Sequence, residues 1–283
     1  GGLDAVLGRL VPLFGEKLSS PEREAVLAVL NGVLGDYLET SGNPLAIHMR
    51  LRRDGHPLQL DKSALSSAPP DAGGKLLVLA HGLCMNDLQW ERQGHDHGTA
   101  LARDLGYTPV YLHYNSGRHI STNGREFADQ LEILVANWPV AVKELAILGH
   151  SMGGLLARSA WHYGTAADHT WPRRLKKLVF LGTPHHGAPM ERGGNLIDIA
   201  LGVSPYTAPL SRLGKIRSAG ITDLRHTWLL DEDWRGRDRF ARSSGHHAAV
   251  PLPDGVKCFA IAATTGKQAG DIKDRLVGDG LVP

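Results

Sequence analysis

Cysteine, net charge and long apolar runs are all scarce in this 283-residue sequence. The two cysteines, Cys84 and Cys258, lie far apart, which excludes a disulfide-rich secreted scaffold and a cysteine-based zinc module. The formal charge of +2 gives no electrostatic reason to expect nucleic acid or an anionic membrane as a partner. Because no apolar run approaches the roughly 18 residues of a membrane span, we expect no transmembrane segment.

A signal-peptide pattern is also missing at the N-terminus, which slightly favours a cytoplasmic location. Gly1 and Gly2 are also consistent with a trimmed N-terminus, so the sequence does not determine where the native protein starts. Hydrophobic residues make up 42% of the chain and charged residues 21%, which excludes wholesale disorder and predicts a globular protein. The length suffices for one large α/β domain with a sizeable core.

Residues 1–70 are predicted to form an N-terminal helical extension. Ser20 followed by Pro21 is a typical helix start, and an apolar stripe of helical spacing continues to Leu38. Gly32 and Gly35 interrupt this stripe and weaken the helix prediction. A polar, proline-containing stretch at 66–71 has the composition of a linker.

Short apolar runs then alternate with helical stretches along the rest of the chain. The runs lack the polar alternation of half-exposed strands, so they suit strands that are covered on both faces. Repeated strand–helix alternation predicts an α/β protein with an open, mostly parallel sheet flanked by helices. The predicted strands are 75–80, 109–114, 145–148, 175–181 and 256–262, and the predicted helices are 98–105, 124–137 and 152–163.

The interval at about 185–254 breaks this rhythm. Some 70 residues are too many for a plain connection between two core strands. The interval contains an apolar stretch at 196–203 and an acidic, aromatic stretch at 228–234. We therefore expect a helical cap inserted here, in a domain that spans 71–283.

The sharpest motif is the G-x-S-x-G pattern centred on Ser151. It lies between a strand-like and a helix-like segment, the strand–turn–helix context that a nucleophile elbow requires. Glycines at 149 and 153 leave room for the backbone around a serine held in a tight turn, while the helix N-terminus favours developing negative charge. Ser151 is therefore the candidate nucleophile. Its neighbour His150 is not its base, since adjacent residues in such a turn diverge.

A second motif, His81-Gly82-Leu83, ends the first predicted strand. This is where one amide of an oxyanion hole is expected, and the residue after the nucleophile supplies the other. The two candidate donors are thus the backbone N–H groups of Leu83 and Met152.

These motifs, together with Gly-Thr-Pro-His-His-Gly at 182–187, resemble the lipase and esterase branch of the α/β-hydrolase superfamily. The combination is similar to GPI-inositol-deacylase-like proteins and to bacterial triacylglycerol lipases. The resemblance covers about residues 75–283 and implies the α/β-hydrolase fold, a large cap and an ester-hydrolysing serine enzyme.

In this family the order along the chain is serine, acid, histidine. The segment Gly-Asp-Gly-Leu-Val at 278–282 resembles the acid loop of bacterial lipases, which implies that Asp279 is the triad acid; Asp271 and Asp274 are weaker candidates. Only four residues follow Asp279 and none is a histidine. We therefore expect the catalytic histidine beyond Pro283, in a native C-terminal element that this sequence lacks.

Upstream histidines are the alternative bases. The candidates are His185, His186, His246 and His247. A further cluster, His95-Asp96-His97, has the residue types of metal ligands, but no third ligand at a typical spacing accompanies it, so a solvated loop is favoured and no metal is expected.

The predicted function is a serine carboxylester hydrolase that acts through an acyl-enzyme on an apolar or lipid-like ester, without a cofactor. Three activities share the same acyl-enzyme and stay open: thioesterase, amidase and acyltransferase. A non-catalytic binding protein of the same fold is the alternative from another class. The sequence does not indicate an oligomeric state.

Overall fold

The computed structural model describes residues 20–66, 72–185, 218–237, 248 and 250–262. Within these residues the chain forms a seven-stranded sheet with the order β2-β1-β6-β3-β7-β8-β9. The five strands from β6 to β9 run parallel, whereas β1 pairs antiparallel with β6, and β2 with β1. The bounds are Arg50–Arg53 (β1), His56–Pro57 (β2), Lys75–Ala80 (β3), Thr108–His113 (β6), Glu144–His150 (β7), Leu175–Leu181 (β8) and Lys257–Ile261 (β9).

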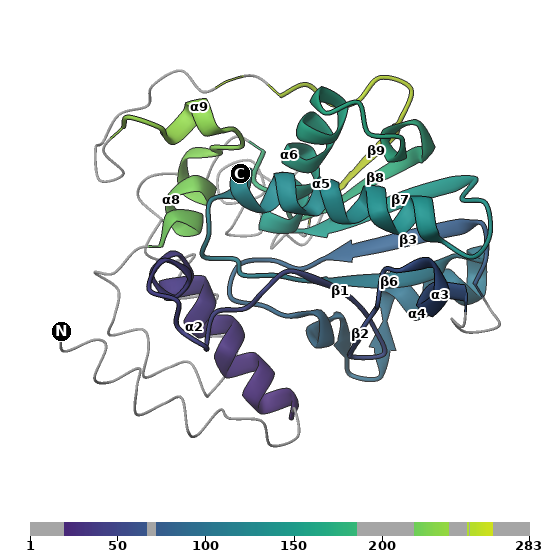
Figure 1. Ribbon diagram of the computed structural model, residues 1–283, viewed down its shortest axis with the longest axis horizontal. Helices are drawn as coiled ribbons and strands as arrows, with labels where there is room; N and C mark the ends of the chain where they lie inside the picture. Colours follow the sequence, from purple (N-terminus) through teal and green to yellow (C-terminus); the bar gives the residue numbers. More distant parts are fainter. Residues whose placement is uncertain (1–19, 67–71, 186–217, 238–247, 249, 263–283) are drawn as a thin grey trace, which may run out of the picture.

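Helices cover both faces of the sheet (Figure 1). The described helices are α2 (Pro21–Thr40), α3 (Lys62–Ser66), α4 (His97–Leu105), α5 (Ile120–Asn137), α6 (Met152–Ala166), α8 (Ala219–His226) and α9 (Asp231–Trp234), with the 3₁₀ turns η2 (Asp87–Trp90) and η3 (Trp171–Arg174). A short hairpin pairs β4 (Glu91–Arg92) with β5 (His95–Asp96). None of the described helices has both the length and the hydropathy needed to cross a bilayer.

Alternate residues of β3 enter two different cores. Leu76 and Val78 pack with apolar side chains of α5 and α6, whereas Leu77 and Leu79 pack on the opposite face near Leu101 of α4. All four side chains are buried. This arrangement explains the continuous apolar runs in the sequence, and it confirms the predicted mostly parallel sheet flanked by helices.

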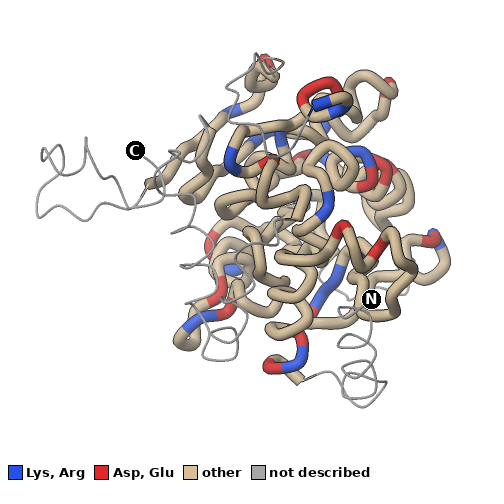
Figure 2. Tube along the Cα trace, turned by 90° about the vertical axis from the view of Figure 1, so that its left-hand side faces the viewer, with Lys and Arg blue, Asp and Glu red and all other residues tan. Residues whose placement is uncertain are grey.

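The helix predicted to start at Ser20 is present as α2. The Ser20 side chain caps it by accepting the Arg23 backbone N–H, and Pro21 occupies its first turn. Most of α2 is buried, and Figure 1 shows it beside α8 at one end of the sheet. β1 extends the sheet beyond β6, with which it pairs antiparallel. Acidic and basic residues are interspersed along the described chain (Figure 2).

Candidate active site

Ser151 occupies a sharp turn between β7 and α6. Its backbone angles are φ +50° and ψ −118°, in a region that costs a residue with a side chain on the order of 1–3 kcal/mol. The turn is held from both sides, since the Ser151 N–H donates to the Leu181 carbonyl at 2.8 Å and its carbonyl accepts the Gly154 N–H at 3.1 Å. Strain retained in this way is typical of functional positions and supports the nucleophile elbow.

The glycines of the motif are required by close backbone contacts. A Cβ at Gly149 would lie 2.5 Å from the Gly154 Cα, and a Cβ at Gly153 would lie 2.2 Å from the carbonyl oxygen of Ala80. A side chain at either position would therefore displace the start of α6 or the end of β3. The spacing of glycines in the sequence thus follows from the tight junction of β3, β7 and α6.

The loop that follows β3 lies directly against Ser151. A Cβ on Gly82 would lie 3.2 Å from the Ser151 Cβ and 3.0 Å from Nδ1 of His150. Leu83 and Met152, which carry the two amides of interest, are buried and belong to one apolar cluster. The structure therefore brings together the sequence-predicted Ser151, Leu83 and Met152.

A tight turn shapes this loop. The Met85 N–H donates to the Gly82 carbonyl at 3.3 Å, so that Leu83 and Cys84 occupy the middle of the turn. Cys84 has φ +58°, and its N–H donates to the Ser116 hydroxyl at 3.1 Å. We call residues 82–87 the oxyanion loop, after the role that the sequence predicts for the Leu83 N–H.

His81 lies beneath this loop and has no exposed surface. Its ring stacks on Tyr114 at 4.3 Å between centroids, and its Nδ1 lies 2.9 Å from the Gly82 carbonyl. Since a carbonyl only accepts, Nδ1 carries the proton. Burial lowers the pKa of His81 to about 3, against the raising effect of the Gly82 hydrogen bond, so the ring is neutral at physiological pH.

The proposed acid and several candidate bases fall outside the described residues. These are Asp279, Asp271, Asp274, His186, His246 and His247. His185 is described: its Nδ1 lies 3.2 Å from Nη1 of Arg158, which can only donate, and its ring contacts the edge of Phe180. A triad base uses Nδ1–H to donate to a carboxylate, so the contact with Arg158 argues against His185 in that role.

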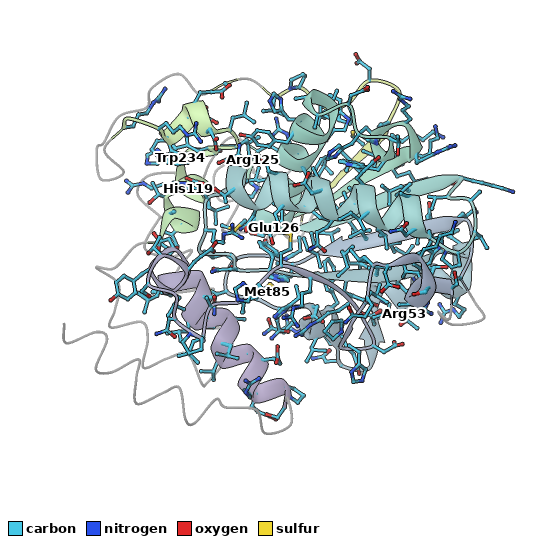
Figure 3. All side chains as sticks on the ribbon, in the orientation of Figure 1. Arg53, Met85, His119, Arg125, Glu126 and Trp234 are labelled. Carbon is cyan, nitrogen blue, oxygen red and sulfur yellow. The ribbon has the colours of Figure 1, made fainter. Side chains whose placement is uncertain are left out.

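The described part of the insertion is tied to the core by contacts that the sequence did not reveal. Asp223 of α8 is fully buried, lies 3.0 Å from Nδ1 of His119 and accepts the Ile120 N–H at 2.8 Å. His119 stacks on Trp234 with centroids 3.8 Å apart (Figure 3). These partners are about 100 residues apart in sequence, so no local pattern signals the pairing.

A second anchor completes the attachment of this segment. Asp233 of α9 accepts the backbone N–H groups of Leu229 and Leu230, both at 2.9 Å, and that of Ala248 at 2.7 Å. The Leu229 carbonyl in turn accepts from the Ser159 hydroxyl of α6 at 2.7 Å. The segment from α8 to α9 is therefore fixed on α5 and α6. A mobile lid makes few buried contacts, whereas this segment makes several.

Replacing Asp223 by asparagine is expected to remove a pH dependence of stability. Burial raises the pKa of Asp223 to about 6, although the His119 and Ile120 hydrogen bonds oppose this. A carboxyl with a raised folded pKa stabilises the fold below its unfolded pKa of about 3.9, and this contribution is lost as pH rises through 6. Urea unfolding at pH 4 and pH 7 should show the wild type losing on the order of 2 kcal/mol relative to D223N. The exposed Asp254→Asn is the control, and parallel pH profiles for all three proteins would contradict the expectation.

The His95-Asp96-His97 cluster has a structural role. The Asp96 carboxylate caps α4 by accepting the Thr99 N–H and also accepts the Tyr111 hydroxyl. His95 and His97 are exposed and lie 3.2 Å apart through ring nitrogens. In the part of the chain that the structure describes, no three such side chains gather as metal ligands.

Comparison with known proteins places the chain in a family. The profile of the PGAP1-like alpha/beta domain matches residues 71–252, more than half of the sequence. The chain belongs to this family. Its membership and the mostly parallel sheet confirm the α/β-hydrolase superfamily that the motifs indicated. A search of curated proteins gave no match.

Several solved structures are similar to this chain. A lipase from Bacillus licheniformis in its mature form has a TM-score of 0.47 and 16% identity, over 83% of this chain and 82% of that one. An esterase from Pyrococcus furiosus has a TM-score of 0.36 and 13% identity, over 55% and 57%. A hydrolase from Pseudomonas aeruginosa has a TM-score of 0.35 and 16% identity, over 62% and 67%. At such identities, the activity of this chain has to be argued from its own site.

Proposed function

We propose that this protein is a serine carboxylester hydrolase. The single observation that carries the proposal is the strained backbone of Ser151 at the N-terminus of α6, directly against the glycine of the oxyanion loop. A serine in such a turn presents its hydroxyl above the end of the sheet, where the positive end of the helix dipole favours developing negative charge.

In the proposed reaction, the Ser151 Oγ attacks the ester carbonyl carbon while a histidine takes its proton. The resulting oxyanion accepts hydrogen bonds from the N–H groups of Leu83 and Met152. Collapse of the tetrahedral intermediate breaks the bond to the alkoxy group, which takes the proton from the histidine and leaves as the alcohol. Water then attacks the acyl-enzyme by the same route and releases the acid. This sequence needs no cofactor.

Asp279 is proposed to orient the histidine by accepting its Nδ1–H and to stabilise the imidazolium that forms. The superfamily order expects that histidine C-terminal to the acid. The acyl group is proposed to be apolar or lipid-like, which rests on the resemblance to lipases and on the large insertion after β8. The same acyl-enzyme would serve thioester or amide cleavage and acyl transfer, so the leaving group has to be determined by assay.

Labelling with a fluorophosphonate tests the proposal on the full-length protein. We expect one equivalent of probe on Ser151, located by peptide mass spectrometry, and no label on Ser151→Ala. p-Nitrophenyl esters of graded chain length would then define the acyl preference, with thioester and anilide analogues as competitors. Folded wild-type protein that takes no label at Ser151 would contradict the enzyme proposal and favour a binding protein of the same fold.

A further inference from the structure

Helix α2 lies outside the matched family region, yet it contacts the oxyanion loop through its backbone. A Cβ at Gly32 would lie 2.3 Å from Sγ of Cys84 and 3.0 Å from its Cα and N. One turn later, a Cβ at Gly35 would lie 1.8 Å from Oδ1 of Asn115, whose Nδ2 donates to the Gly35 carbonyl at 3.0 Å. The two glycines that weakened the helix prediction are therefore contact positions.

Cys84 is held from both sides. Gly32 packs on its sulfur and backbone, while the Ser116 hydroxyl accepts its N–H. Cys84 directly follows Leu83 within the turn closed by Gly82 and Met85. Cys84 is bonded directly to Leu83, so a shift of Cys84 would move the Leu83 backbone and, through its Cα, the Gly82–Leu83 peptide that carries the proposed oxyanion donor.

The first turn of α2 reaches the other end of the oxyanion loop through a buried ion cluster. Glu24 lies 3.3 Å from Arg52 of β1, and the same Arg52 nitrogen lies 3.1 Å from Asp87. Asp87 in turn lies 2.9 Å from Nδ1 of His113 in β6. The side chains of Glu24 and Asp87 are 6% and 2% exposed. Burial would raise the pKa of Asp87, but the contacts with His113 and with the Arg52 guanidinium outweigh it and keep the pKa below its ordinary value.

The apolar side chains of α2 complete the contact. They share one buried cluster with Leu83 and Met152, the two residues whose amides are proposed to bind the oxyanion. The members from α2 are Leu27, Val29, Leu30, Val33, Leu34 and Leu38.

We propose that α2 positions the oxyanion loop. Gly32 sets the position of Cys84 and hence that of the adjacent Leu83 backbone. Glu24 holds the other end of the loop through Arg52 and Asp87. Gly32 and Glu24 are thus positioning residues, which act through the loop and do not touch the substrate. This proposal rests on the proposed function, because it takes the Leu83 amide as an oxyanion donor.

The main test is Gly32→Ala in the full-length protein, with ester hydrolysis followed by kcat and KM. The added methyl group has to displace Cys84, so we expect kcat to fall by a factor on the order of 10–100 with KM within about threefold, since a donor that serves only the transition state is disturbed. The matched control is Gly164→Ala in the last turns of α6, where the new Cβ would lie 2.8 Å from the Trp171 ring of η3. That variant should lose thermal stability but keep kcat.

Rescue and a second variant separate positioning from general damage. Cys84→Gly in the Gly32→Ala background removes the sulfur and suits the positive φ of residue 84, so it should restore kcat to within about fivefold of wild type. Glu24→Gln keeps the shape of the cluster and should lower kcat about tenfold at unchanged KM, which keeps the proposal testable if Gly32→Ala does not fold.

These experiments distinguish a failure of the positioning role from a failure of the proposed function. If Ser151→Ala abolishes hydrolysis but Gly32→Ala and Glu24→Gln keep wild-type kcat, the positioning role of α2 is wrong and the serine mechanism stands. If Gly32→Ala and Gly164→Ala lower kcat equally, the effect is loss of stability and not positioning. If Ser151→Ala keeps its activity, the proposed function itself fails.

Discussion

Ester hydrolysis by Ser151→Ala is expected to fall by a factor on the order of 10⁴–10⁶, because the nucleophile of the proposed acyl-enzyme mechanism is lost. The alanine variant keeps the Cβ and therefore the backbone strain at φ +50°. Its thermal unfolding should consequently resemble that of the wild type. Activity is measured with p-nitrophenyl esters, and unfolding by calorimetry or circular dichroism.

Ser151→Gly extends this result to the energy stored in the turn. Glycine adopts φ +50° without strain, but it loses about 0.5–1 kcal/mol of chain entropy on folding. We therefore expect the glycine variant to be as inactive as the alanine variant and more stable than it by about 1 kcal/mol, or roughly 2–4 °C in Tm. Activity within tenfold of wild type in either variant would remove Ser151 from the reaction. Equal Tm values would mean that the strain in the turn is no larger than the chain entropy of about 0.5–1 kcal/mol that glycine loses.

The second large effect is a loss of stability in acid that originates at His81. In the folded state burial lowers its pKa to about 3, whereas the unfolded pKa is about 6.5. A histidine with a depressed folded pKa contributes full stability above pH 6.5, and this contribution is lost as pH falls towards 3 because the unfolded chain binds the extra proton. One titrating group changes the free energy of unfolding by at most about 1.4 kcal/mol per pH unit. The free energy of unfolding at pH 4 should therefore be lower than at pH 7 by on the order of 3 kcal/mol.

His81→Asn tests this contribution, because its amide nitrogen can replace Nδ1 as donor to the Gly82 carbonyl while the group no longer titrates. The variant should be less stable than wild type at pH 7, since the ring that stacks on Tyr114 is lost. The difference in the free energy of unfolding between wild type and His81→Asn, measured in urea, should narrow or reverse at pH 4. His56→Gln, at an exposed position, serves as the control. A gap that is the same at both pH values would mean that His81 titrates normally in the folded protein.

The centre of the sheet was predictable because β3 and β7 are buried on both faces. Continuous apolar runs marked each parallel strand to within a residue or two, for example 75–80 for β3 and 175–181 for β8. The capping serine and the following proline likewise located the start of α2. Local chemistry determines these features. The short β1 strand has three arginines around one buried leucine and no apolar run, so its pairing with β6 could not be anticipated from its sequence.

The glycines around Ser151 and after His81 were also predictable, since they form short motifs that can be read in the sequence. The backbone contacts that require Gly82 and Gly153 join segments about 70 residues apart and became visible only in the structure. The partners of Asp223 and Glu24 were not predictable. Asp223 and Glu24 each pair with a residue of a distant segment, and no sequence pattern predicts which residue a buried carboxylate contacts. Gly32 and Gly35 did carry a signal: two glycines one turn apart in an otherwise apolar helix indicate close backbone packing.

The position of α2 also bears on how the protein can be divided for expression or engineering. The family profile starts at residue 71, but a fragment cut there would lack the helix that covers Leu83 and Met152 and the strand that covers the edge of β6. The exposed apolar surface and the unpaired strand edge would both promote aggregation of the fragment. A fragment that keeps this packing intact therefore includes Ser20, about 50 residues ahead of the boundary that sequence comparison gives.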